Sequence, residues 1–243
     1  MQPLEFSNGT VFSEGRHIYT ISAAPGHRVY GERTPVVDGK EYREWNPNRS
    51  KLAAYIANGG KVLPIGKCSN VLYLGASSGT TPSHVSDMAS EGKVYCVEFA
   101  PRMFRELVGN CSPRPNMMPI LADATKPSEY QFVVGSADVV YEDVAQKNQA
   151  DILADNMEVF GARYGMVAVK ARSEDVAEAP KAVFRRAEER LKERGMRILD
   201  ARSLEPFEDS HEMIVVERHE RGYRRYDIHH RIQGRTLPDG VEP

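Results

Sequence analysis

The sequence predicts an α/β protein with a seven-stranded, mostly parallel sheet whose last strand is reversed, preceded by a small β-rich unit. Apolar strand-like runs alternate with helical stretches from residue 71 onward, which indicates right-handed βαβ units and a parallel sheet. Only Glu205 to Ser210 separate the last two runs. Six residues are too few for a parallel crossover, so the last strand is expected to run antiparallel.

The first 44 residues are predicted to form the small β-rich domain. Tyr19–Ser22 and Val36–Tyr42 have strand patterns, and Asp38-Gly39 is a good hairpin turn. We assign this unit no chemistry and expect it to serve packing or interaction. Asn46-Pro47-Asn48 should then start a helix that continues to about residue 58, where Gly59-Gly60 ends it.

The second predicted domain covers residues 45–219 and contains the large sheet. Its strand-like runs are Val71–Gly75, Val94–Phe99, Met117–Asp123, Ala137–Val144, Gly165–Ala171, Arg197–Leu204 and His211–Arg218. Six parallel strands and one reversed strand are the layout of the Rossmann-like class I fold. Residues 220–243 are rich in Arg and His without an apolar period, and are predicted to be a basic C-terminal tail.

The composition limits the classes of protein and the kinds of partner that are possible. The chain has 243 residues, of which 41% are hydrophobic and 27% charged. It contains neither a run of roughly 18 apolar residues nor a signal peptide pattern. We therefore expect a cytoplasmic protein without membrane contact. The three cysteines show no CxxC or Cys/His spacing, so no metal site is expected. The net charge of −2 argues against unaided binding of nucleic acid through many phosphate contacts.

A glycine-containing turn follows the first strand of the sheet. Gly75-Ala76-Ser77-Ser78-Gly79-Thr80-Thr81 lies where ligands of open α/β sheets bind. Ser77 and Thr80 stand where the dinucleotide pattern GxGxxG needs glycine, and the GK[ST] of the phosphate loop is absent. A nucleoside without pyrophosphate fits better, and S-adenosylmethionine is such a ligand.

Acidic residues end the next three strands. Glu98 stands at about the distance beyond the glycine turn where an acid binds a ribose diol. Asp123 ends the third strand, where it could accept the adenine amino group, and Asp143 ends the fourth. One such acid is most simply a helix cap. Three at one edge of the sheet favour a ligand site.

Basic residues gather at the same edge. Lys170 closes the fifth strand beside Asp143, and His211 begins the reversed strand, so both are expected at the carboxyl edge. Lys51 is in the first turn of the helix that precedes the sheet, and reaches this edge if that helix runs back against the sheet. A surface or capping role would explain each residue alone, but their joint placement favours function.

These segments resemble the archaeal fibrillarin family over roughly residues 15 to 218. The resemblance rests on REWNP and RSKL (residues 43–52), VLYLGASSGTTPSHVSD, VYCVEFAPR, PILADATKP, YEDVAQKNQA, GMVAVKARS and EPFEDSHEMIVV. It implies an S-adenosylmethionine-dependent RNA 2′-O-methyltransferase that acts on ribosomal and transfer RNA. It also implies assembly into a box C/D guide-RNA ribonucleoprotein, with a Nop-domain scaffold protein and a kink-turn-binding protein. The Gly/Arg-rich N-terminal region of eukaryotic members is absent here, and the basic tail departs from the archaeal pattern.

The resemblance also implies roles for individual residues. Its catalytic tetrad corresponds to Lys51, Asp143, Lys170 and His211. Lys170 is expected to contact the 2′-hydroxyl and assist loss of its proton, and His211 and Lys51 to orient the nucleotide. The implied cofactor contacts are Gly75, Thr80, Thr81, Glu98, Phe99, Asp123, Ala124, Asp143 and Gln146, to which we add Ala76, Ser77, Gly79, Val144 and Ala145 as neighbours in the same turns.

Three other interpretations compete with this one. An FtsJ-type RNA methyltransferase would act without a guide RNA, but that family has Glu where His211 stands, and would be expected to carry its own basic surface. A non-catalytic ribonucleoprotein subunit could keep the fold as a scaffold, although the intact tetrad and cofactor turn argue against it. A nicotinamide-dependent dehydrogenase is disfavoured by the failed glycine pattern.

Overall fold

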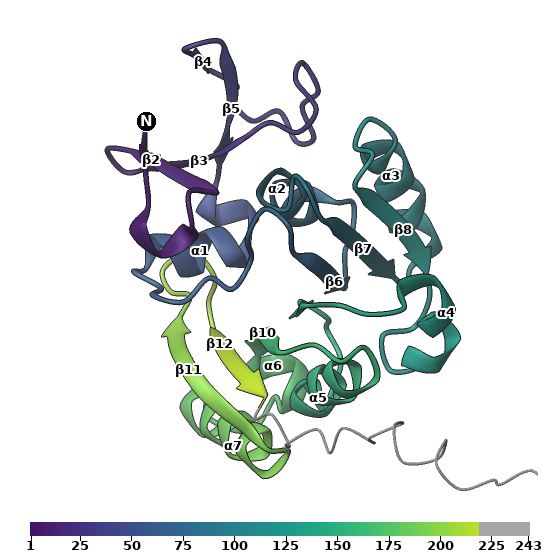
Figure 1. Cartoon of the computed structure of the whole chain (residues 1–243). Coiled ribbons are helices and arrows are strands. Elements are labelled where there is room, and N and C mark those ends of the chain that lie inside the picture. The colour runs from purple at the N-terminus through teal and green to yellow at the C-terminus, as the bar shows by residue number, and fades with distance from the viewer. Residues whose placement is uncertain (219–243) are drawn as a thin grey trace, which may run out of the picture.

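The computed structural model describes residues 1–218 (Figure 1). The predicted basic tail over 220–243 lies outside the described residues. Two β-sheets are present: a five-stranded antiparallel sheet from the N-terminal segment and a seven-stranded sheet from the rest. Both parts of the predicted fold class are thus confirmed.

The seven-stranded sheet has the order β11-β12-β10-β9-β6-β7-β8. Its strands are β6 (Asn70–Leu74), β7 (Lys93–Glu98), β8 (Met117–Leu121), β9 (Val139–Glu142), β10 (Tyr164–Lys170), β11 (Met196–Ser203) and β12 (His211–Arg218). β12 runs antiparallel to both of its neighbours, so the predicted reversed last strand is confirmed. The crossover through α7 leaves one strand position between β10 and β11, and the hairpin after β11 returns β12 into it.

Helices cover both faces of this sheet (Figure 1). One apolar core joins one face to α1 (Lys51–Ala57), α2 (Thr80–Met88) and α3 (Pro101–Cys111). A second core joins the other face to α4 (Gln131–Val134), α5 (Gln149–Val159) and α7 (Pro180–Glu193). The short α6 (Ala171–Glu174) and η3 (Pro127–Glu129) complete the connections. Within residues 1–218, no helix is long and apolar enough to cross a membrane.

The N-terminal sheet has the order β1-β2-β3-β5-β4. Its strands are β1 (Gln2–Pro3), β2 (Val11–Glu14), β3 (His17–Ile21), β4 (Val36–Val37) and β5 (Lys40–Trp45), with η1 (Glu5–Ser7) after the first. The predicted hairpin turn at Asp38-Gly39 is confirmed, and both residues have the positive φ that such turns need. β1 and β2 were not predicted. Val11, Ile18 and Trp45 of this sheet belong to the same core as α1.

The predicted continuous helix over residues 46–58 is wrong. The segment forms η2 (Pro47–Arg49), an extended Ser50 with φ of −154°, and then α1 from Lys51. The Ser50 hydroxyl accepts a hydrogen bond from the Ala53 backbone N–H at 3.3 Å. Serine favours this capping conformation over a helical one, and Lys51 therefore stands at the first position of α1.

Buried charges join the N-terminal sheet to α2. Arg43 of β5 is 0% exposed, and its guanidinium donates to Glu32 Oε1 and, at 2.7 Å, to Asp87 Oδ2 of α2. Arg114 donates to Asp87 Oδ1 at 2.6 Å. The same Arg43 also donates to Ser83 Oγ at 3.0 Å. Removing one member of such a buried group leaves an uncompensated charge, so the N-terminal sheet and α2 stabilise each other.

His84 of α2 lies at the centre of this contact and is fully buried. Its ring stacks on Trp45, with 4.7 Å between ring centroids. The Thr20 hydroxyl donates to Asp87 Oδ2 and lies 2.8 Å from His84 Nδ1, and the Tyr30 hydroxyl lies 2.8 Å from Nε2. Burial lowers the pKa of His84 well below its usual value, and the charges of Arg43 and Arg114 act in the same direction.

The neutral state of His84 predicts loss of stability in acid. A histidine with a lowered pKa in the folded state contributes stability above its unfolded pKa of about 6.5, and this contribution is lost as pH falls below that value. Between pH 7.5 and 5.5 we expect His84 to lower the free energy of unfolding by an amount on the order of 1 kcal/mol. Urea unfolding of the wild type and His84→Gln at both pH values measures this, and equal pH dependence in the two proteins contradicts it.

Candidate active site

The four predicted catalytic residues come from four different elements. Lys51 is the first residue of α1, Asp143 follows β9, Lys170 ends β10 and His211 begins β12. Lys170 and His211 are directly paired in the register of β10 and β12. The antiparallel direction of β12 thus brings its first residue to the edge where β9 and β10 end.

Asp143 lies between the two lysines. The Lys170 ammonium is 2.9 Å from Asp143 Oδ1 and 3.1 Å from the Asp143 backbone oxygen. The Lys51 ammonium is 3.3 Å from Oδ1 and 3.4 Å from Oδ2 of the same carboxylate. These three side chains are only 15–16% exposed. Glu208 Oε1 lies 4.0 Å from the Lys51 ammonium, so the two lysines face two carboxylates, of which Asp143 contacts both. In this partly desolvated position each charge acts strongly on a neighbouring group.

His211 presents one ring nitrogen for binding. Its Nδ1 is 2.7 Å from the Asp209 backbone oxygen, which can only accept, so Nδ1 carries the proton and Nε2 has a free lone pair. Burial lowers the pKa of His211, and the charges of Lys51 and Lys170 lower it further, against the opposing Asp209 hydrogen bond. The neutral ring therefore offers an acceptor beside two cations.

Gln149 connects the ends of β9 and β10, and the sequence analysis did not identify it. It is fully buried at the start of α5. Its side-chain amide donates to the Val144 oxygen at 2.7 Å, and its oxygen accepts from the Lys170 backbone N–H at 2.9 Å. A carboxylate oxygen of Glu174 accepts from the Gln149 backbone N–H at 2.7 Å. A glutamine within a helical pattern carries no signal of such a role.

Glu142 lies next to Asp143 in sequence but on the opposite face of the sheet, in the second core. Burial raises the pKa of Glu142 well above its usual value, and Glu174 adds to the effect. Neither carboxyl oxygen has a hydrogen-bond partner among residues 1–218. A neutral Glu142 adds no charge at this edge, so Asp143 supplies the negative charge between the lysines.

The predicted cofactor turn runs close to Asp143. Gly75 has a φ of +79°, and a Cβ atom there would lie 2.6 Å from the Asp143 backbone oxygen. Gly79 has a φ of +96° and caps α2, which begins at Thr80. The turn contacts the cap of α1, because the Thr81 hydroxyl donates to Ser50 Oγ at 3.0 Å. Only glycine allows the approach at position 75.

The Glu98 carboxylate is held by two backbone N–H groups, one from the glycine turn and one from the residues after β7. Its Oε2 accepts from the Ser77 N–H and its Oε1 from the Ala100 N–H, each at 2.7 Å. Glu98 is 9% exposed. Because each carboxylate oxygen has two lone pairs, one on each oxygen stays available for a pair of hydroxyl groups. This geometry fits a ribose diol.

Asp123 and Gln146 meet at the ends of β8 and β9. The Thr125 backbone N–H is 3.0 Å from Asp123 Oδ1 and lowers the pKa of Asp123, and the side chains of Thr125 and Gln146 act in the same direction. The predicted cofactor residues differ in their exposure. Phe99 is 66% exposed, whereas Ala124 and Val144 are buried. Among the others, Ala76 and Thr81 are buried, Ser77 and Ala145 are exposed, and Thr80 is half-buried. The structure thus places an ionised acid just after β8 and an exposed aromatic ring directly after Glu98.

The residues at this edge suit S-adenosylmethionine. A glycine permits close approach of the backbone, and a fixed carboxylate faces the position of a ribose diol. The turn over residues 75–81 contains no Lys or Arg that could bind a pyrophosphate. The assignment of individual side chains to the cofactor and to catalysis stays a prediction.

Comparisons with known proteins identify the family. The model of the family described as fibrillarin matches residues 7–220. The chain belongs to the fibrillarin family. The resemblance seen in the sequence is thereby confirmed, and the dehydrogenase interpretation is excluded.

Three members of the fibrillarin family show how close the similarity is. A fibrillarin-like rRNA/tRNA 2′-O-methyltransferase of Methanopyrus kandleri is 53% identical over 213 residues, which are 86% of this chain and 92% of the relative. Fibrillarin of Aeropyrum pernix, solved with natively bound S-adenosyl-L-methionine, has a TM-score of 0.76 and 45% identity, and the match covers 82% of this chain and 88% of that one. A fibrillarin/Nop5p complex has a TM-score of 0.79 and 39% identity, covering 86% and 97%.

Proposed function

We propose that this chain is the S-adenosylmethionine-dependent RNA 2′-O-methyltransferase subunit of a box C/D guide-RNA ribonucleoprotein that modifies ribosomal and transfer RNA. The observation that carries the proposal is the pair of lysines, Lys51 and Lys170, on the single carboxylate of Asp143 beside a glycine turn. The names of the fibrillarin-like relatives and the structure with bound cofactor support it.

The cofactor site uses side chains from successive strand ends. Glu98 would accept hydrogen bonds from the ribose hydroxyls, Asp123 from the adenine amino group, and the turn at Gly75 would lie against the methionine part. When bound, S-adenosylmethionine supplies an electrophilic methyl group on its sulfonium sulfur. Asp143 stands between this turn and the lysines, so it belongs to both parts of the site.

The chain's own residues then act on the substrate hydroxyl. A ribose 2′-hydroxyl is a weak nucleophile that must be held in line with the methyl carbon. Lys170 contacts this hydroxyl and assists loss of its proton, because its ammonium stabilises the developing oxyanion. Asp143 holds both lysines in place. His211 Nε2 accepts a hydrogen bond from the nucleotide and orients it.

The activity is tested by reconstitution. The full chain, a Nop-domain scaffold protein, a kink-turn-binding protein and a guide RNA are combined with a target strand and labelled cofactor. Label should enter the single ribose that the guide selects. A target with a 2′-deoxyribose at that position is the matched control and should accept none. Label that enters bases, or equal label in the deoxy target, contradicts the proposal.

Glu98 provides a test of the cofactor site alone. Glu98→Ala should weaken S-adenosylmethionine binding by about 1.5–3 kcal/mol, because it removes charge-assisted hydrogen bonds to the ribose. Titration calorimetry measures the effect. Glu106→Ala, which removes an exposed acid of the following helix, should bind like the wild type. Unchanged affinity in Glu98→Ala would reject this assignment.

A further inference from the structure

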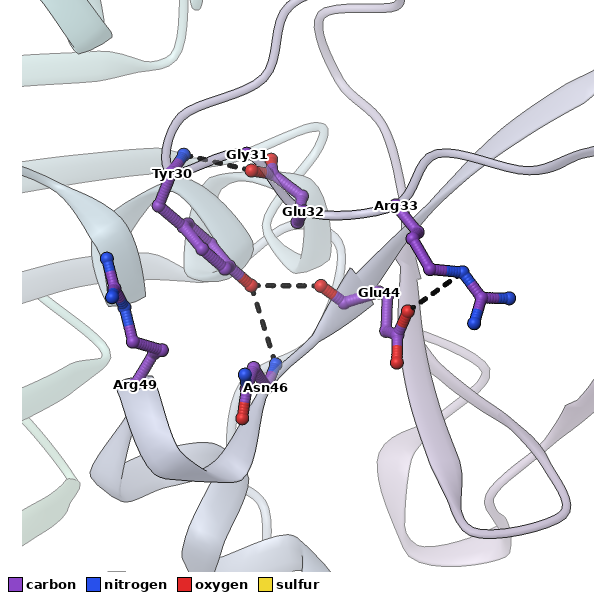
Figure 2. A pocket seen from close by; sticks show the side chains of 7 residues that line it. All are labelled: Tyr30, Gly31, Glu32, Arg33, Glu44, Asn46 and Arg49. Carbon is purple, nitrogen blue, oxygen red and sulfur yellow. Dashed lines mark hydrogen bonds and ion pairs between the residues drawn. The ribbon is translucent and has the colours of Figure 1, made fainter.

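A hollow of ≈ 250 Å³ lies on the N-terminal unit, immediately before the helix that carries Lys51 (Figure 2). Its lining comes from the loop after β3, from the end of β5 and from η2; the residues are Tyr30, Gly31, Glu32, Arg33, Glu44, Asn46 and Arg49. We infer that this hollow binds a nucleotide of the RNA strand close to the one that is methylated. The inference rests on the proposed function and adds a second contact for the substrate strand.

Tyr30 forms a rigid platform in the hollow. Its hydroxyl donates to the Glu44 backbone oxygen at 2.9 Å and accepts from the Asn46 N–H at 3.4 Å (Figure 2). The same hydroxyl lies 2.8 Å from His84 Nε2. The Arg49 guanidinium lies over the ring, 5.8 Å from its centroid. An A-form duplex of guide and target is contacted mainly through its phosphates and 2′-hydroxyl groups, because its bases are paired. The fixed Tyr30 ring holds the Arg49 guanidinium at the rim, where it can contact a phosphate of the target strand.

The charge at the rim favours an anionic ligand. Arg49 is exposed and has no acidic partner among the described residues 1–218. Arg33 bonds Glu44 through Nε at 3.3 Å and is 69% exposed, so its terminal nitrogens stay available. Glu32 on the floor is already paired with the buried Arg43. The accessible charge is therefore mainly arginine, which suits phosphate.

The hollow is adjacent to the catalytic group along the chain. Arg49 and Lys51 are separated only by Ser50, so their Cα atoms are at most about 7.6 Å apart. The Lys51 ammonium in turn contacts Asp143. A strand that places one ribose at Lys170 therefore passes within reach of Arg49. This continuity favours RNA over an acidic segment of a protein partner.

The test uses the full chain in the reconstituted ribonucleoprotein. Arg49→Ala should raise the KM for the target strand about tenfold or more, as expected for loss of a charge-assisted hydrogen bond to phosphate, with kcat at saturating RNA unchanged. Arg49→Lys keeps the charge without the plane and should recover part of the loss. Arg16→Ala is the matched control, since it removes an exposed arginine of the same unit that does not line the hollow. It should behave like the wild type.

Three results overturn the inference. The KM of Arg49→Ala is unchanged or rises no more than that of Arg16→Ala. Alternatively kcat falls while KM stays constant, which places Arg49 in support of Lys51. Alternatively the variant fails to assemble with the scaffold, which makes the hollow a protein contact.

A second readout does not depend on methyl transfer. Target strands with a photoreactive nucleotide at successive positions are crosslinked to the assembled wild-type complex, and the peptides are mapped. A crosslink to the peptide of Tyr30 or Arg49 from a position next to the target supports the inference. Absence of such a crosslink from every position rejects it. A wild-type complex that gives this crosslink without methylation rejects the proposed function instead.

Discussion

Replacement of Lys170 by alanine should lower the single-turnover rate of methyl transfer by a factor of about 10²–10⁴, the usual range for loss of a group that assists proton transfer. Affinity for S-adenosylmethionine should be nearly unchanged. Lys170 ends β10, and its ammonium is 2.9 Å from Asp143 Oδ1. Its loss removes the contact to the 2′-hydroxyl and half of the positive charge on the carboxylate, without touching the residues placed around the adenosine.

Two further variants separate the roles of this cluster. Asp143→Ala should reduce both turnover and cofactor affinity, because this residue lies beside the turn at Gly75 as well as between the lysines. Lys67→Ala removes an exposed lysine at the start of the sheet and should leave both unchanged. Calorimetry and rapid-quench methylation in the assembled complex measure the two quantities. Full activity of Lys170→Ala rejects the mechanism.

The isolated chain should bind RNA weakly and methylate it negligibly. Each phosphate that Lys or Arg neutralises contributes to affinity, and proteins that bind RNA alone make many such contacts. This chain has 32 basic against 34 acidic residues. The described basic groups near the active site can place one or two nucleotides but cannot select a sequence. Binding and methylation should both rise sharply once a scaffold protein and a guide duplex present the target ribose.

Methylation of one RNA under two conditions measures this dependence. The RNA is incubated with the chain alone and with the chain, scaffold, kink-turn-binding protein and guide, and the modified position is mapped in both. An assembled complex that carries Lys170→Ala is the control for trace activity of other components. Efficient, site-selective methylation by the chain alone contradicts the prediction, and favours an RNA methyltransferase that works without a guide.

The strand pattern was sufficient to predict most of the fold. The seven strands of the large sheet lie within two residues of their predicted ends, because buried parallel strands are continuous apolar runs with turn residues between them. The short hairpin before β12 forced its reversal. β1 and β2 were not found, because strands of two and four residues are too short to show a clear alternating pattern. The break at Ser50 was missed because its capping role depends on a single hydrogen bond.

Within the candidate site, the residue types were readable but their connections were not. Strand ends at one edge of a parallel sheet must lie together, so Glu98, Asp123, Asp143 and Lys170 could be grouped from order alone. Gln149 could not be found, since its function depends on bonding the ends of two strands that only the folded sheet brings together. The hollow at Tyr30 likewise joins three segments that are separate in sequence.

The sequence by itself determined the α/β class, the reversed last strand, the edge at which the functional groups gather and the family. Each of these follows from local periodicity, loop length or unusual sequence motifs, none of which requires knowledge of distant contacts. Only the tertiary structure decided that two lysines share one carboxylate, that Asp209 sets the protonated nitrogen of His211, and that the buried Arg43 joins the N-terminal sheet to α2. These features depend on distances and burial between segments, and both are properties of the packed chain.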